Sequence, residues 1–85
     1  MNISMTRGGK LAAAAGGAST MRGKVAAVVT AWADGQPRWE PVPDETVISA
    51  SLDVVVSPAT RRAALKGLAE QGLLIQDANG RYYAA

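Results

Sequence analysis

The side chains best suited to chemistry gather in one short stretch of the chain. Thr60, Arg61, Arg62 and Lys66 would lie on the polar side of a single helix. Arginine and lysine side chains are hydrogen-bond donors without acceptors, so a cluster of them is suited to binding an anion. The stretch therefore predicts a surface for a negatively charged partner.

The sequence, by contrast, lacks two residue types that are common in catalytic sites. The sequence contains no His and no Cys, so a catalytic site would need a carboxylate pair or a Ser–Lys pair. The acidic residues are scattered, and Ser57 and Lys66 would be about 13–14 Å apart along a helix axis. The pairs Gly8-Gly9 and Gly16-Gly17 lack the lysine and hydroxyl of a phosphate-binding loop. We therefore expect no enzyme activity, no metal and no cofactor.

The element that must position the basic cluster is a predicted helix over residues 57–71. Ser57 is a suitable N-cap, and Pro58 suits the first helical position, where a missing N–H costs nothing. Gly72 ends the helix, because glycine readily enters the left-handed region. The predicted apolar stripe consists of Ala64, Leu65, Leu68 and Ala69.

A hairpin is predicted directly after this helix. Asn79-Gly80 separates the apolar run 73–75 from Tyr82 and Tyr83, and this dipeptide between two such runs is a strong hairpin signal. A basic helix closed off by a tight hairpin is typical of a winged helix-turn-helix that faces DNA.

Two further helices are predicted upstream. The first covers residues 19–33 and is capped by Ser19 or Thr20. Its buried face consists of Met21, Val25, Val28, Val29 and Trp32. The second begins at Asp44, and its buried face consists of Val47, Ile48 and Leu52.

Between these two helices we expect a loop with a short edge strand around Arg38–Val42, since proline is tolerated in strands only at edges. Trp39 is interpreted as a lid over the core, with a partner contact as the alternative.

The predicted fold class is α+β: a small winged helix-turn-helix of three helices and a C-terminal two-stranded β-hairpin wing. Residues 19–85 would form this domain, and residues 1–18 a flexible N-terminal tail or a mobile basic arm that touches DNA. Charge is uneven along the chain. Residues 1–24 carry four basic and no acidic residues, residues 25–56 are acidic, and residues 57–85 are basic again. A polyanion would therefore meet the two ends of the chain.

A cytoplasmic location is expected. No apolar run approaches the ~18–20 residues that span a bilayer, and the absence of Cys fits a reducing compartment. Arg7 and Lys10 ahead of an alanine tract faintly resemble a signal peptide, but Gly16-Gly17 interrupts that tract.

A string of motifs between residues 19 and 84 points to one family. The matching residues are Pro43-Asp44-Glu45, Ile48 and Leu52 in the second helix, then Val56-Ser57, Thr60, Arg62, Ala64-Leu65 and Leu68, then Gly72-Leu73, and finally Asn79-Gly80, Tyr82 and Tyr83. With these residues the chain resembles the DNA-binding module of the GntR-type winged helix-turn-helix repressors.

Several positions depart from that family's pattern. Pro58 and Ala59 stand where the family carries an Arg and a polar residue, and Thr46 stands where an Arg often follows the Glu. Arg61 replaces an apolar residue, so its side chain must snorkel or the helix must be rotated. The turn before Ser57 is also longer. No effector domain follows the wing in this sequence, so we expect no small-molecule effector.

The resemblance implies roles for the candidate residues. Helix 57–71 would enter the major groove, with the 76–82 wing beside it. Ser57 and Thr60 would face a phosphate at the helix N-terminus, and Arg62 would read guanine. Arg61 and Lys66 would contact phosphates. The wing would reach a neighbouring minor groove through Asn79, Gly80 and Arg81.

The expected partner is double-stranded DNA, and the expected function is that of a small repressor-like transcriptional regulator of bacterial or phage type. A single module should bind weakly, so a homodimer or tandem copies on repeated sites are expected. The alternative is a winged helix that serves as a protein-interaction or assembly module in replication, segregation or virus assembly, since fold does not settle function.

Overall fold

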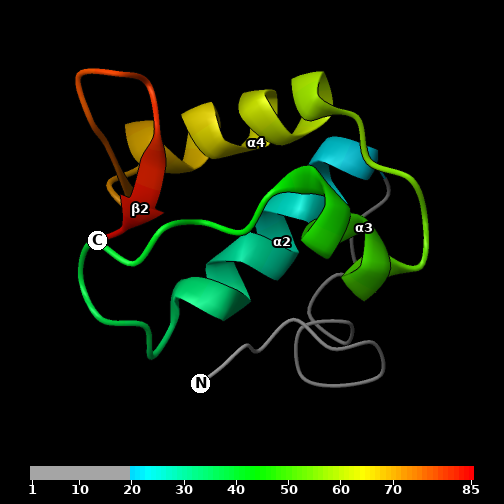
Figure 1. The fold of residues 1–85 in the computed structure, drawn as a ribbon, viewed down its shortest axis with the longest axis horizontal. Coiled ribbons are helices and arrows are strands. Elements are labelled where there is room, and N and C mark those ends of the chain that lie inside the picture. The colour runs from blue at the N-terminus through cyan, green and yellow to red at the C-terminus, as the bar shows by residue number, and fades with distance from the viewer. Residues whose placement is uncertain (1–19) are drawn as a thin grey trace.

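The computed structural model describes residues 20–85, and in this range three helices precede one antiparallel hairpin. The order is α2 (Met21–Ala33), α3 (Glu45–Leu52), α4 (Pro58–Glu70), β1 (Leu74–Gln76) and β2 (Tyr82–Ala84). Figure 1 shows α4 running alongside α2, with the hairpin beside α4. The predicted α+β winged helix-turn-helix is confirmed. The predicted tail, residues 1–18, lies outside the described residues, as does Ser19.

Helix α2 forms as predicted. The Thr20 hydroxyl accepts a hydrogen bond from the Gly23 N–H at 3.0 Å, which makes Thr20 the N-cap. The apolar positions recur at helical spacing, so four of the five predicted face residues are buried and Met21 packs partly against them. The buried four are Val25, Val28, Val29 and Trp32.

Helix α3 begins at the predicted cap but turns a slightly different face inward. The Asp44 carboxylate accepts from the Val47 N–H at 3.0 Å. Val47 was predicted to be buried and is 40% exposed, whereas Ser51 is buried. Ile48, Ser51 and Leu52 stand at i, i+3 and i+4, so they share the inward stripe of this two-turn helix and Val47 falls at its edge.

Both ends of α4 agree with prediction. The Ser57 hydroxyl accepts from the Thr60 N–H at 3.1 Å, and Pro58 occupies the first turn. At the other end Gly72 has a φ of 80°, and its N–H bonds the Ala69 carbonyl at 3.0 Å. Leu73 N–H bonds the Leu68 carbonyl at 3.0 Å, which completes a Schellman motif.

The hairpin is present with the register Leu74↔Ala84, Ile75↔Tyr83 and Gln76↔Tyr82. Its turn is longer than two residues. Gly80 N–H bonds the Asp77 carbonyl at 3.1 Å. Gly80 has a positive φ of 84°, whereas the φ of Asn79 is not positive. The chain therefore turns through loop 77–81, with the glycine at the left-handed position.

The predicted edge strand at Arg38–Val42 is reduced to a single bridge, Pro41↔Tyr83. Ala84 N–H bonds the Glu40 carbonyl at 2.8 Å, and Val42 N–H bonds the Tyr82 carbonyl at 3.1 Å. Pro41 has no N–H, so the pairing rests on its two neighbours. Through these two hydrogen bonds the loop before α3 is still held against β2.

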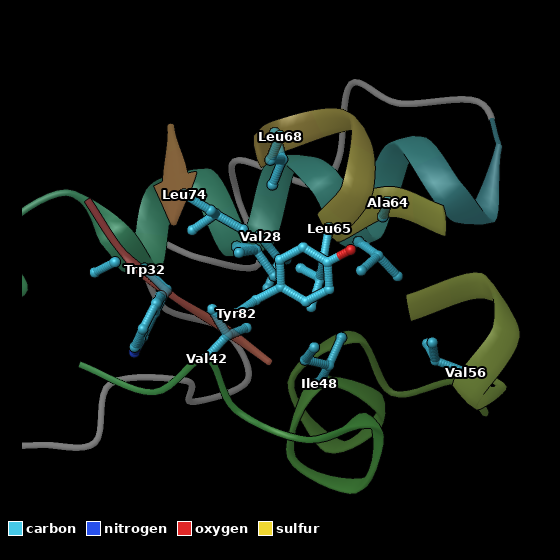
Figure 2. Packing of buried hydrophobic residues seen from close by; sticks show 13 residues of the cluster. Val28, Trp32, Val42, Ile48, Val56, Ala64, Leu65, Leu68, Leu74 and Tyr82 are labelled. Carbon is cyan, nitrogen blue, oxygen red and sulfur yellow. The ribbon is translucent and has the colours of Figure 1, made fainter. Parts of the chain in front are cut away.

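The core gathers side chains from every element, and in Figure 2 the Tyr82 ring lies among Val42, Ile48 and Leu65. Trp39 is not part of this cluster. It is 51% exposed, so its prediction as a lid was wrong. Val42 is buried in the cluster, whereas Trp39, with a φ of 71°, lies against the Tyr83 ring with centroids 5.4 Å apart.

Candidate nucleic-acid interface

The exposed face of α4 carries two of the predicted cations. Arg62 and Lys66 are both exposed and stand one helical turn apart, so their side chains are neighbours on the surface. Ala59 and Ala63 are exposed on the same face and are small. This face therefore combines positive charge with room for close approach to the helix backbone.

At the N-terminus of α4 the two predicted hydroxyls bond each other. Ser57 Oγ accepts from the Thr60 N–H and also donates to Thr60 Oγ1 at 3.0 Å. Ser57 is exposed and Thr60 is half-buried. An anion at this end of the helix would therefore meet a closed cap, in which part of the hydrogen-bonding capacity is already used.

Arg61 has a different environment from its neighbour Arg62. It precedes Ala64 and Leu65 by three and four residues, so it falls on the buried stripe of α4. Its Nε donates to the Pro43 carbonyl at 2.9 Å and its Nη2 to the Val42 carbonyl at 3.3 Å. Burial lowers the pKa of Arg61, and the charges of Glu45 and Asp44 partly oppose this. The guanidinium therefore does not snorkel fully into water; it is half-buried and braces the loop before α3.

The wing is organised around the Asp77 carboxylate. Oδ1 accepts from the Asn79 and Arg81 N–H groups, each at 2.9 Å, and Oδ2 accepts from the Tyr83 hydroxyl at 2.7 Å. These hydrogen bonds, that of Tyr83 foremost, hold the pKa of Asp77 below its usual range, and the same contact raises the pKa of Tyr83. Loop 77–81 is thus tied to β2 through one side chain.

A hollow of about 350 Å³ lies between α4 and the wing. Arg61 and Arg62 line it from α4, and Gly80 and Arg81 line it from the wing; Glu45 is an acidic residue of its wall. We call this feature the basic hollow. It brings together four of the eight predicted site residues. The other four, Ser57, Thr60, Lys66 and Asn79, lie outside its lining.

Reasoning from sequence missed two features next to this surface. Ser49 Oγ donates to the Glu45 carbonyl and accepts from the Val56 N–H at 2.8 Å, so it fixes the turn between α3 and α4. Tyr83 lines the basic hollow and carries the exposed Trp39 ring against its own. The prolines on both sides of Trp39 were a usable signal, because they favour a surface loop over a core strand.

The described residues also bear on metal binding and on membrane insertion. In residues 20–85 no three carboxylates come together in a group that could hold a metal ion. Over that same range, none of the helices has the length and apolarity needed to cross a membrane.

Comparison with known proteins adds no relative: the chain matches no protein-family model, no curated protein and no solved structure.

Proposed function

We propose that this protein binds double-stranded DNA sequence-specifically, with α4 in the major groove and the wing beside it. The observation that carries the proposal is the basic hollow, where Arg62 of α4 and Arg81 of the wing line one surface. A duplex presents phosphates along both edges of its major groove, so cations from two elements on one face suit it.

Within this proposal the exposed face of α4 reads bases. Arg62 bonds guanine O6 and N7, a pairing worth about 1–3 kcal/mol of discrimination. Ala59 and Ala63 let the helix approach closely and contact thymine methyl groups. Lys66 and Arg81 neutralise phosphates. Arg61 is left out of the contact set, because its Nε and Nη2 already donate to the Pro43 and Val42 carbonyls and hold the side chain against the loop.

The cellular role proposed is that of a small cytoplasmic, repressor-like regulator without catalytic activity, cofactor or small-molecule effector. The motif resemblance to GntR-type modules supports this role, and the winged helix-turn-helix fold agrees with it. Two copies, as a homodimer or in tandem on repeated half-sites, would supply the affinity that one small module lacks.

Fluorescence anisotropy with a selected duplex tests the proposal. With Lys66 and Arg81 neutralising phosphates, log K should fall with log salt at a slope of about −2. Arg62→Ala should abolish the preference for the selected site while the fold is kept. Arg22→Ala removes the same charge from the exposed surface of α2 and should retain the preference for the selected site. Binding that ignores salt, or a preference unchanged in Arg62→Ala, would contradict the proposal.

A protein-interaction module is the second candidate, and exposed apolar residues favour it. Val47 and Val54 are each 40% exposed and Val55 is 87% exposed, on α3 and the following turn. Exposed apolar side chains mark contact surfaces where they lie together. If no duplex binds even at low salt, and Val55→Asp abolishes a complex with a partner protein, this second function replaces the first.

A further inference from the structure

Trp39 stands out because it is a large side chain held outside the core by a strained backbone. Its φ of 71° lies in the left-handed region, which bulky residues rarely adopt. The Trp39 N–H donates to the Ala84 carbonyl at 2.9 Å, which holds the conformation in place. Strain maintained in this way often accompanies a functional role for the residue.

Tyr83 completes an aromatic surface with Trp39. Tyr82 and Ala84 point into the core, so strand alternation turns Tyr83 outward between them. The two ring centroids are 5.4 Å apart with planes inclined by 58°. The Tyr83 hydroxyl is also bonded to Asp77, which fixes this ring from the wing side. We call Trp39 and Tyr83 the aromatic pair.

Two arginines flank the aromatic pair, together with the carboxylates of Glu40 and Asp77. Arg38 is exposed and directly precedes Trp39. Arg81 lies close enough to Tyr83 for its charge to oppose the rise that Asp77 causes in the pKa of Tyr83. Tyr83 also lines the basic hollow together with Arg62, so the aromatic pair continues that surface. Exposed rings beside arginines complement a nucleic acid, whose phosphates are anionic and whose bases have flat faces.

We infer that the aromatic pair stacks on an unpaired base, so that the protein prefers a duplex with a single-stranded extension to a blunt duplex. Away from its ends, a duplex covers both faces of each base with neighbouring bases, whereas a base outside the helix offers a free face to Trp39. The inference rests on the proposed DNA binding, because the basic hollow would hold the adjoining duplex.

Anisotropy titrations with a blunt duplex, the same duplex with a thymidine tail, and single-stranded oligothymidylate test this inference. The wild-type protein should bind the tailed duplex about tenfold more tightly than the blunt one. Trp39→Ala should lose this gain and bind the blunt duplex like wild type. Val55→Ala, a truncation of another exposed apolar side chain, is the matched control and should retain the gain.

Tryptophan fluorescence gives a second readout that does not depend on the alanine variant. The chain has two tryptophans, and Trp32 is only 5% exposed, so quenching by oligothymidylate reports on Trp39. Quenching should occur in the wild-type protein and disappear in Trp39→Phe, which leaves Trp32 as the reporter.

Each alternative outcome has a distinct meaning. Equal binding of blunt and tailed duplexes by wild type overturns the inference, as does a loss in Trp39→Ala that is equal for both duplexes. A change of oligomeric state in Trp39→Ala, seen by light scattering, assigns the aromatic pair to a protein contact and also overturns it. If no duplex binds but oligothymidylate still quenches Trp39, the proposed duplex binding fails while stacking on unpaired bases stands.

Discussion

At the scale of single residues, Arg61 and Arg62 are adjacent in sequence but differ in what their side chains contact. Arg61 donates to two backbone carbonyls of the loop before α3, whereas Arg62 is exposed beside the basic hollow. The difference follows from helical phase, because Arg61 shares the inward stripe with Ala64 and Leu65 and Arg62 does not. One arginine therefore supports the fold, and the other is available to a ligand.

This difference predicts opposite effects of two alanine substitutions. Arg61→Ala should lower the free energy of unfolding by about 1–3 kcal/mol, since it removes charged donors from half-buried carbonyls. Arg62→Ala should change it by less than about 0.5 kcal/mol. Urea denaturation midpoints measure both. Equal midpoints for the two variants would refute the structural role of Arg61.

Ser49 and Ser51, two residues apart on α3, make a second matched pair. The Ser49 hydroxyl bonds the Val56 N–H, but the buried Ser51 hydroxyl has no hydrogen-bond partner among the described residues. Ser49→Ala should destabilise the protein by about 1–2 kcal/mol, because it leaves that N–H unsatisfied. Ser51→Ala should stabilise it by about 1 kcal/mol. Thermal denaturation would show midpoints shifted in opposite directions, and a shared direction would contradict this account.

At the scale of elements, the wing depends on the Asp77 carboxylate for its shape. Three donors converge on this group, from the Asn79 and Arg81 backbones and the Tyr83 hydroxyl. Two backbone hydrogen bonds close the same loop, from the Asp77 N–H to the Arg81 carbonyl at 2.9 Å and from the Gly80 N–H to the Asp77 carbonyl at 3.1 Å. A change in the charge of Asp77 should therefore alter the conformation of the whole wing.

The pKa of Asp77 is lower in the folded state than in the unfolded chain, and this sets the sign of the pH dependence. The stabilisation is present above the unfolded pKa, about 3.9, and is lost as the pH falls through the lower folded value. Amide NMR signals of Asn79 and Arg81 should titrate with a midpoint below about 3.9. In Asp77→Asn that titration should be absent. A wild-type midpoint at or above the ordinary aspartate value would show that these bonds do not form in solution.

The start of α4 is a second element whose stability rests on one side chain. Ser57→Ala removes the N-cap acceptor of the Thr60 N–H and should cost about 1 kcal/mol. Ser57→Asp restores an acceptor and adds a negative charge at the positive end of the helix, so it should recover stability. The same aspartate should weaken DNA binding, because it repels phosphate. If Ser57→Asp raised both the stability and the DNA affinity, the result would argue against the proposed position of this helix end at the DNA.

At the scale of the whole molecule, the proposed DNA contacts come from one small domain. The part of the chain that the structure describes packs three helices and a hairpin around a single core. With two proposed phosphate contacts, the electrostatic share of binding is modest at physiological salt. Two linked copies should therefore bind repeated half-sites more tightly than one copy does.

A tandem fusion tests this expectation directly. Two copies joined by a flexible linker should bind a duplex with two half-sites about one helical turn apart roughly 10²-fold or more tightly than a single copy does. The gain should vanish on a duplex with one half-site. If the fusion gains nothing on paired sites, the protein does not use repeated half-sites.

Local patterns in the sequence were enough to predict the three helices, their ends and the hairpin, but not the edge strand at Arg38–Val42, which is a single bridge. Thr20, Asp44 and Ser57 cap their helices, Gly72 ends α4, and a hairpin follows at Asn79-Gly80. These features depend on residues within about four positions of one another, so they can be predicted from neighbours in the chain.

Only the tertiary structure decided what long-range packing controls. Val47 turned outward, Trp39 left the core, and Arg61 bonded carbonyls eighteen and nineteen residues earlier in the chain. The basic hollow likewise requires α4 and the wing to meet, and no local pattern specifies that angle. Side-chain types and helical phase are written in the sequence, but which of several apolar or charged groups is covered depends on how much space the neighbouring elements leave.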